Sequence, residues 1–340
     1  MPQERLPRRM TAVLLNGHGG VEQLEFRNDV PVPTPGAGEV LIRVGAAGVN
    51  NTDINTRTAW YSRGDDSGWT GAAMEFPRIQ GADACGRIVA VGESVDPHRL
   101  GERVLVEPVF RGAKVRYFGS ECDGAFAEFA RVPAAHAYRI DSALTDAELA
   151  SFPCAYSAAE NMLERLHLLA GETVLVTGAS GGVGSAAIQL ARRRGATVFA
   201  IAGESKADAV MSFGAGRVLA RGSNLSRALG RESVDAVVDV VGGGQFPALL
   251  EVLKRRGRYA VAGAIAGPVV ELDLRTLYLK DLRLLGCTVL EPQVFGNLVG
   301  YIERGEITPV IAAVRPLSEI VAAQQAFLDR RQVGKIILQP

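Results

Sequence analysis

The clearest pattern in the chain is a short apolar run followed by glycines and then by a helical repeat. Residues 173–177 are β-branched and apolar over a length typical of a fully buried strand. A glycine-rich stretch, 178–184, follows, and from Val183 onward the apolar positions recur with the spacing of a helix. A second apolar run, 197–202, comes after a Gly195-Ala196 helix end. The pattern therefore predicts a strand, a tight turn, a helix and another strand.

This succession is the first half of a βαβ unit that binds a dinucleotide. Ala179 stands where the first glycine of G-x-G-x-x-G turns the chain, while Gly181 lets the backbone approach a pyrophosphate and Gly184 lets the helix pack closely. An ordinary glycine turn is the alternative, and the second strand favours nucleotide binding. The free N–H groups and the dipole of the helix start would face the phosphates. We expect these phosphates at Ser180, Gly181, Gly182, Val183 and Gly184.

The rest of the chain falls into two kinds of pattern. Up to residue 145, short strands separated by Gly and Pro are typical of an all-β barrel, with strands expected at 11–15, 39–44, 86–91, 103–106 and 125–129. From residue 146, helical stretches at 147–169 (interrupted near Pro153), 206–213 and 246–253 alternate with strands at 234–241, 257–262 and 282–288. This alternation predicts a parallel, doubly wound sheet.

The final apolar run, 335–338, has no strand partner nearby in the sequence, so we expect it to return to the barrel. The predicted fold is therefore α/β. A barrel domain comprises residues 1–150 and 301–340, and a doubly wound dinucleotide-binding domain, residues 151–300, is inserted before the return.

Composition narrows the class of function. Lys plus Arg and Asp plus Glu both number 37, and this zero net charge argues against a nucleic-acid partner. No apolar run is long enough for a membrane span, and the first residues lack the apolar core of a signal peptide. The 4 cysteines are scattered without a C-x-x-C pair, which predicts reduced thiols in a cytoplasmic protein.

The order of these parts resembles the medium-chain dehydrogenase/reductase superfamily across essentially the whole chain. That family joins a GroES-like barrel to a Rossmann domain and returns to the barrel. The segments that carry the resemblance are Gly38–Val44, Gly48–Asp53, Gly81–Gly86, Asp123–Glu128 and Thr177–Gly184. Within the superfamily they look most like the zinc-independent quinone oxidoreductases. Short-chain dehydrogenases share the T-G-x-x-x-G-x-G pattern, but no Tyr-x-x-x-Lys follows it here, which rejects that family.

The resemblance implies a catalytic zinc only where the ligands of the zinc enzymes are present. Those enzymes use a Cys in G-V-C-x-T-D, a His in G-H-E and a later Cys. Here the first position is Asn50, the G-H-E segment reads Gly-Ala-Asp and ends at Asp83, and only Cys154 matches. One thiol and one carboxylate make a poor four-coordinate site, so we expect no metal. Packing is the plainer interpretation of Cys154.

The end of the second strand of the nucleotide domain indicates which cofactor is bound. NAD enzymes place Asp or Glu there to bind the ribose 2′-hydroxyl, and this chain places Gly203, with Glu204 one residue later. Ser205 and Lys206 follow, and Arg221 comes after the third strand. Cationic side chains suit a 2′-phosphate, which favours NADPH over NADH. The alternatives are that both cations are solvated surface charges and that Glu204 binds the ribose.

Further cofactor contacts are expected at the carboxyl ends of the fourth and fifth strands, which line the crevice of a doubly wound sheet. The residues there are Val241, Gly242, Gly263, Ala264 and Ile265, and we add Lys335 at the start of the last strand.

Candidate catalytic residues come mainly from the resemblance. Asn50 and Asp53 match the N-x-x-D of the quinone oxidoreductases and Arg57 also aligns, whereas the family's Tyr two residues after the Asp is Asn55 here. The alternative for Asn50 and Asp53 is a turn held by side-chain to backbone hydrogen bonds. Tyr61 belongs to a long irregular segment, 58–76, that also holds Trp60 and Trp69 and suggests a substrate lid or exposed packing. Tyr156 is expected to border the nicotinamide.

These residues predict hydride transfer without a metal, which suits acceptors activated by conjugation, such as quinones and α,β-unsaturated carbonyls. The alternatives are a zinc-dependent alcohol dehydrogenase-like enzyme and a non-catalytic NADPH-binding protein. The strand at 282–288 is the last of its sheet and is expected to pair across a homodimer interface, because edge strands are paired or blunted.

Overall fold

The computed structural model describes residues 6–62 and 74–340, and the chain forms two compact units. Unit 1 comprises residues 1–154 and 309–340, and unit 2 comprises residues 155–308. The boundaries therefore lie at 154/155 and 308/309 rather than at 150/151 and 300/301. The first boundary is later than expected because it falls inside a helix, α3 (Pro153–Arg165), instead of before it.

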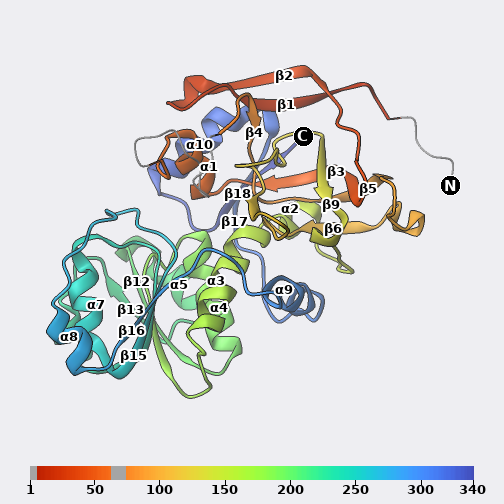
Figure 1. The fold of residues 1–340 in the computed structure, drawn as a ribbon. Helices are drawn as coiled ribbons and strands as arrows, with labels where there is room; N and C mark the ends of the chain where they lie inside the picture. The colour runs from red at the N-terminus through yellow and green to blue at the C-terminus, as the bar shows by residue number, and fades with distance from the viewer. Residues whose placement is uncertain (1–5, 63–73) are drawn as a thin grey trace. The chain divides into compact units, whose positions relative to one another are not determined.

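Unit 1 is built mainly from antiparallel strands, and its last strand comes from the far end of the chain (Figure 1). Its strands are β1 (Arg9–Leu15), β2 (Leu24–Pro31), β3 (Glu39–Gly48), β4 (Arg78–Ile79), β5 (Cys85–Val91), β6 (Arg103–Val106), β7 (Val109–Phe110), β8 (Arg116–Tyr117), β9 (Phe129–Pro133), β10 (Ala137–Arg139), β17 (Ile311–Pro316) and β18 (Lys335–Gln339). Its helices are α1 (Asn51–Arg57), α2 (Asp146–Leu149) and α10 (Ile320–Asp329).

β3 is the central strand of unit 1. The larger sheet has the order β10-β6-β5-β3-β18-β17, and β9 also pairs with β3. β18 pairs antiparallel with β3, with Ile337 opposite Gly48 and Leu338 opposite Ala47. This pairing confirms that the last strand returns to the barrel. It also brings the start of β18 close to the end of β3, where α1 begins.

One strand of unit 1 was placed wrongly by the sequence pattern. β9 begins at Phe129, where the expected strand at 125–129 ends. Ala125, Phe126 and Ala127 are fully buried, which explains their strand-like apolarity. They run past β1 through an isolated bridge between Ala12 and Ala127 rather than as a ladder.

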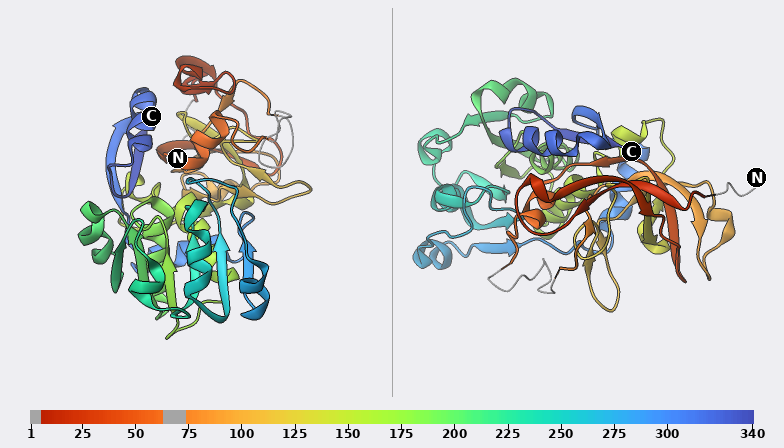
Figure 2. Two further views of the ribbon diagram at one scale, coloured as in Figure 1. Left: turned by 90° about the vertical axis from the view of Figure 1, so that its left-hand side faces the viewer. Right: turned by 90° about the horizontal axis from the view of Figure 1, so that it is seen from above.

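Unit 2 is a parallel sheet with helices on both faces, and all of its residues are described. In chain order its elements after α3 are β11 (Thr173–Val176), α4 (Gly182–Arg193), β12 (Thr197–Ala202), α5 (Ala207–Ser212), β13 (Arg217–Ala220), α6 (Leu225–Leu229), β14 (Val234–Asp239), α7 (Phe246–Val252), β15 (Leu253–Val261), α8 (Leu274–Leu279), β16 (Arg283–Gly286) and α9 (Val294–Glu303). The strand order is β13-β12-β11-β14-β15-β16. α7 and α8 flank one side of the sheet and α3 and α4 the other (Figures 1 and 2).

This order, 3-2-1-4-5-6 in terms of the successive strands, is that of the Rossmann fold and confirms the predicted class. The order reverses between β11 and β14, so their carboxyl ends form the crevice where such sheets bind ligands. Val174, Leu175 and Val176 are fully buried, as expected for a strand covered on both faces. Within residues 6–62 and 74–340, no helix is long and apolar enough to cross a bilayer.

Candidate active site

The glycine turn between β11 and α4 has the close packing that the motif predicts. A Cβ atom added to Gly184 would lie 2.2 Å from the carbonyl oxygen of Gly178, so no side chain fits at Gly184, in the first turn of α4. Ala179 stands at the position of the first motif glycine, and the left-handed residue of the turn is Gly178 before it, with a φ of 58°, a conformation that glycine adopts at little cost.

The start of α4 is open to an anionic ligand. Gly181 is the N-cap residue and is exposed, and a Cβ atom there would meet only the Gly178 oxygen at 3.4 Å. The first N–H groups of a helix have no partner inside it, and its dipole favours negative charge there. Ser180, Gly182 and Val183 flank this position. These residues fit the pyrophosphate of a dinucleotide.

The end of β12 offers space and positive charge. Nothing lies within 4 Å of a Cβ atom added to Gly203, and Glu204 is exposed. Burial lowers the pKa of Lys206, and the neighbouring charge of Arg221 lowers it further. The charge of Arg221 thus acts on Lys206, the other cation that the sequence places at the 2′-phosphate. A dianion between them would relieve their repulsion.

The crevice loop after β14 is held by a buried carboxylate that the sequence analysis did not single out. Asp239 Oδ1 accepts hydrogen bonds from Thr177 Oγ1 at 2.5 Å, Val241 N at 2.8 Å and Gly242 N at 3.2 Å. Its Oδ2 accepts from the Tyr259 hydroxyl at 2.5 Å. The carboxylate thus fixes the backbone of two residues that were expected to contact the cofactor.

The loops after β14 and β15 are joined by backbone hydrogen bonds. Ala266 N donates to Val241 O at 2.8 Å, and Gly243 N donates to Gly267 O at 3.1 Å. The structure therefore brings Gly263, Ala264 and Ile265 to the same edge of the sheet as Val241 and Gly242, and it leaves Ile265 39% exposed.

Unit 1 carries a compact polar cluster where β3 runs into α1. Asn50, the N-cap residue of α1, and Asp53, in its first turn, are both buried. Asn50 N donates to Asp53 Oδ2 at 2.7 Å, so these residues do form the hydrogen-bonded turn that was the alternative interpretation. Asn50 also makes hydrogen bonds to Asp83 and Lys335, which lie outside this turn.

Lys335 and Asp83 complete this cluster. Lys335 Nζ donates to Asn50 Oδ1 at 2.5 Å and to Asp83 Oδ2 at 2.7 Å. Asn50 Nδ2 donates to the same Asp83 oxygen at 2.8 Å, and Asp83 Oδ1 accepts from Cys154 N at 2.6 Å. Lys335, which the sequence places at the cofactor, is 3% exposed, and it donates two of its three ammonium hydrogens to these unit 1 side chains.

Burial changes the titration of groups in and beside the cluster. It raises the pKa of Asp53 to about 7, although the Asn50 N–H and the Lys335 charge act in the opposite direction. Burial also raises the pKa of the Cys154 thiol, and the nearby Asp83 carboxylate adds to this effect. Cys154 is therefore a protonated thiol at neutral pH. Asp53 titrates close to neutrality and can hold or release a proton there.

Tyr61 lies next to the residue that replaces the family's tyrosine. Asn55 Nδ2 donates to the Tyr61 hydroxyl at 3.1 Å, and that hydroxyl donates to Thr52 Oγ1 at 3.3 Å. Burial raises the pKa of Tyr61 to about 12, with smaller effects from Cys154 and Asp53. The structure thus brings a phenol close to the cluster from a different position in the chain. Trp60 is 46% exposed, while the rest of the expected lid, 63–73 with Trp69, lies outside the described residues.

Two candidate catalytic residues have structural contacts instead. Arg57 is 2% exposed, and it donates to Gln324 Oε1 at 2.9 Å and to Gly19 O at 2.7 Å, so it ties α1 to α10. Tyr156 is 1% exposed, and its hydroxyl donates to Thr308 O and accepts from Gln189 Nε2 within unit 2. Arg57 thus uses two of its five N–H donors within unit 1, and the Tyr156 hydroxyl both donates and accepts within unit 2.

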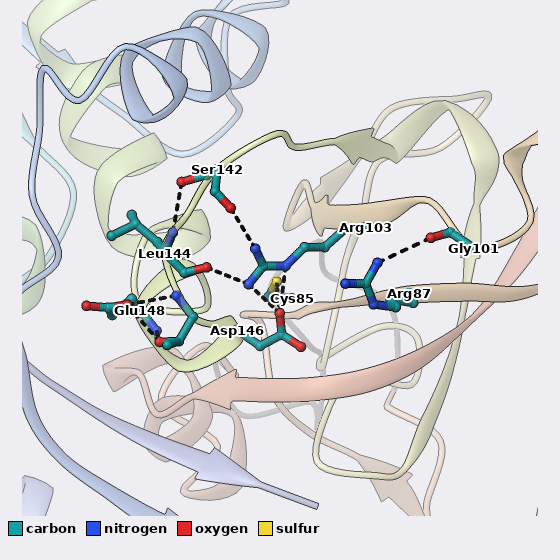
Figure 3. A network of polar contacts seen from close by, with 9 residues as sticks. Cys85, Arg87, Gly101, Arg103, Ser142, Leu144, Asp146 and Glu148 are labelled. Carbon is teal, nitrogen blue, oxygen red and sulfur yellow. Dashed lines mark hydrogen bonds and ion pairs between the residues drawn. The ribbon is translucent and has the colours of Figure 1, made fainter.

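Close packing at Gly48 and the hydrogen bonds of Arg103 support the region around Asp83 and Cys154. A Cβ atom added to Gly48 would lie 2.4 Å from Asp83 Oδ2, so glycine is needed there for the carboxylate to reach Asn50. Arg103 donates to Asp146 Oδ1 at 2.7 Å and to the carbonyl oxygens of Ser142 and Leu144 (Figure 3). This clamp fixes the segment that leads through α2 to Cys154.

The cluster does not fit a zinc ion. Zinc binds thiolate, imidazole or carboxylate ligands, and a catalytic site needs three of them. Asn50 and Asp83 instead face an ammonium group, whose positive charge repels a second cation. Across the ranges 6–62 and 74–340, no group of three or more His, Cys, Asp or Glu side chains is arranged to hold a metal.

Comparison with known proteins supports the same family for both units. Residues 36–142 match the model of the alcohol dehydrogenase GroES-like domain, and residues 182–304 match that of the zinc-binding dehydrogenase. The chain is 30% identical to an acryloyl-coenzyme A reductase of Metallosphaera sedula, over 97% of this chain and 99% of that protein. It is also 30% identical to a quinone oxidoreductase of Lama guanicoe, over 97% and 98% of the two chains.

A solved structure extends this likeness to three dimensions. It is described as a putative alcohol dehydrogenase from Sinorhizobium meliloti 1021, and it is 50% identical with a TM-score of 0.93, covering 98% of each chain. Together with the Rossmann strand order and the glycine turn, these matches show that the chain belongs to the medium-chain dehydrogenase/reductase superfamily and is an NAD(P)H-dependent oxidoreductase of that family.

Proposed function

We propose that this protein is a metal-independent, NADPH-dependent reductase that transfers hydride to a quinone or an α,β-unsaturated carbonyl. The observation that carries the proposal is the Lys335 ammonium bound by Asn50 and Asp83. An alcohol is oxidised more readily when a metal lowers the pKa of its hydroxyl. A conjugated acceptor needs only a positioned hydrogen-bond donor for the charge that develops on its oxygen.

The preference for NADPH is supported by the groups at the end of β12. Bound NADPH supplies the hydride. In unit 2, Lys206 and Arg221 would bind the 2′-phosphate, and the N–H groups after Gly181 the pyrophosphate. Gly203 leaves space where NAD enzymes carry a carboxylate.

Two relatives support the class of acceptor by their names. A quinone and an acryloyl thioester both hold a carbonyl in conjugation with a carbon–carbon double bond, and these are the substrates named in the relatives at 30% identity. The polar cluster of unit 1 would act on the carbonyl oxygen of such an acceptor.

The test is NADPH oxidation by purified protein with a panel of benzoquinones, enones and enoyl thioesters, and a primary alcohol assayed in the opposite direction. Turnover with one conjugated class, and none with the alcohol, is expected. Tight NADPH binding without turnover of any acceptor would favour a non-catalytic role. Alcohol oxidation that requires stoichiometric zinc would overturn the proposal.

We also propose a homodimer formed through β16. This strand is the last in the order of the unit 2 sheet, all of which is described, and Leu284 on it is 36% exposed. An unpaired edge is a template for another strand. The molar mass in solution should therefore be that of two chains, and a monomeric mass would contradict this assembly.

A further inference from the structure

The hydrogen-bond donors of the unit 1 cluster are almost all used within the cluster. Asn50 matches a position that the family resemblance assigns to catalysis, but its amide has only two hydrogens. One is donated to Asp83 Oδ2 at 2.8 Å and the other to Gly48 O at 3.2 Å. The orientation of the amide is settled by chemistry, because the ammonium of Lys335 must face the oxygen Oδ1. Asn50 therefore has no donor for a substrate.

Lys335 is the member of the cluster with a donor to spare. An ammonium carries three hydrogens, and Lys335 uses one for Asn50 Oδ1 and one for Asp83 Oδ2. In the described part of the chain no further acceptor contacts Nζ. The side chain is 4% exposed, so its charge is screened less by water than a surface charge would be.

The surroundings of Lys335 also fix its position. The 4-carbon stem starts on β18, which β3 holds in register, and the carboxylate of Asp83 is itself held by Cys154 N at 2.6 Å. An ammonium fixed in this way needs little reorganisation when charge appears nearby, which is the condition for electrostatic stabilisation of a transition state.

From the spare N–H group and the fixed position of Lys335, we infer that its Nζ is the hydrogen-bond donor that stabilises the oxyanion of the acceptor, in the place of a metal ion. The inference rests on the proposed function. When hydride adds to the β-carbon of an enone, the π electrons of the double bond move toward the carbonyl oxygen, and an enolate forms. Lys335 donates its third N–H to that oxygen and remains protonated, while a proton from water completes the reduced product.

The test uses Lys335→Met, which keeps the length and removes the charge, and the double variant K335M/D83N, which removes the facing charge as well. The double variant guards against unfolding, because an unpaired buried carboxylate destabilises a protein strongly. We expect kcat for an enone to fall about 10²–10³-fold in both variants, the usual loss for one oxyanion donor. NADPH affinity, measured by fluorescence titration, should stay at the parental value. Lys114→Met, at an exposed position of unit 1, is the matched control and should behave as the parent.

A second readout separates catalysis from support of the structure. A benzoquinone accepts hydride more readily than an enone, so its turnover should depend less on the oxyanion donor and fall by a smaller factor. An equal loss for both acceptors in folded variants would mean that Lys335 only supports the site and would overturn the inference. A folded double variant with parental turnover of the enone would also overturn it. If the parent protein reduces no acceptor at all, the proposed function fails instead.

Discussion

Asp239 in unit 2 and Asp83 in unit 1 are both completely buried carboxylates, but their surroundings differ. Asp239 accepts from two hydroxyls and two backbone N–H groups, and among the described residues no cation contacts it. Asp83 faces an ammonium and an amide. Neutral donors stabilise a carboxylate while fixing the groups that donate, whereas an ion pair fixes a charge. We infer that unit 2 uses its carboxylate to position backbone for the cofactor, and unit 1 uses its carboxylate to position a cation for the acceptor.

The largest effect on cofactor binding is expected from Asp239→Asn. An amide cannot accept on both sides, so at least one donor among Tyr259, Thr177 and the loop N–H groups is left unpaired. A lost hydrogen bond to a charged group costs roughly 1.5–3 kcal/mol, so the free energy of unfolding should fall by about that amount. The loop should loosen as well, and if most of that free energy is lost from cofactor binding, the Kd for NADPH, measured by calorimetry, should rise up to about 100-fold.

Asp235→Asn is the control for this comparison. Asp235 lies near the other end of β14, where it accepts from Thr173 N and Lys254 Nζ, and its side chain is 21% exposed. Asp235→Asn should lower the free energy of unfolding by less than Asp239→Asn does and should leave NADPH affinity unchanged. Parental NADPH affinity in Asp239→Asn would mean that the carboxylate does not position the cofactor loop.

A smaller and more selective effect is expected from the double variant K206A/R221A. Removing both cations removes the charge-assisted contacts to a 2′-phosphate, so the Kd for NADPH should rise about tenfold or more. The Kd for NADH, which lacks that phosphate, should not change. Arg217→Ala removes an exposed cation at the start of β13, the strand that ends just before Arg221, and should alter neither affinity. Equal weakening of both cofactors would refute the assignment of the 2′-phosphate site.

Asp53→Asn, which probes unit 1 alone, should leave the Kd for NADPH unchanged. Its effect should be on the pH dependence of stability. The pKa of Asp53 is raised from its ordinary value of 3.8 to about 7, so the folded state binds a proton that the unfolded state releases between those pH values. This carboxyl therefore makes the free energy of unfolding decrease as pH rises from 3.8 to about 7, and the effect is constant above that range. Chemical unfolding at several pH values should show this decrease in the parent and a weaker one in the variant. Identical pH profiles would mean that Asp53 does not titrate in this way.

Sequence reasoning predicted unit 2 better than the unit 1 site, for a physical reason. The glycine turn and the strand order of unit 2 depend on local patterns, such as the spacing from Thr173 to Gly184. The cluster of unit 1 depends on β18 pairing with β3, which brings Lys335 to Asn50 across 285 residues. No local pattern encodes such a contact, so Lys335 was assigned to the cofactor. Asp83 was noted only as a poor metal ligand.

Some of the missed features left a signal in the sequence. Asp239 ends a strand of apolar residues and is followed by Val-Val-Gly. A carboxylate buried in such a setting needs several hydrogen-bond donors, so its presence there indicates a structural hydrogen-bond network. Gly48, two residues before Asn50, is the other signal, because only a residue without a side chain lets Asp83 approach there. The contacts of Tyr156 with Thr308 and of Arg57 with Gln324 join residues far apart in the chain, so sequence position alone does not reveal them.

The central claim is that a fixed ammonium, and no metal ion, serves the acceptor site. The most direct measurement is the zinc content of a sample that is reducing an enone with NADPH, by elemental analysis of the same protein that gives the turnover number. We predict full turnover with far less than one zinc per chain, unchanged after treatment with a chelator. Turnover that rises and falls with bound zinc, toward one ion per chain, would contradict the account.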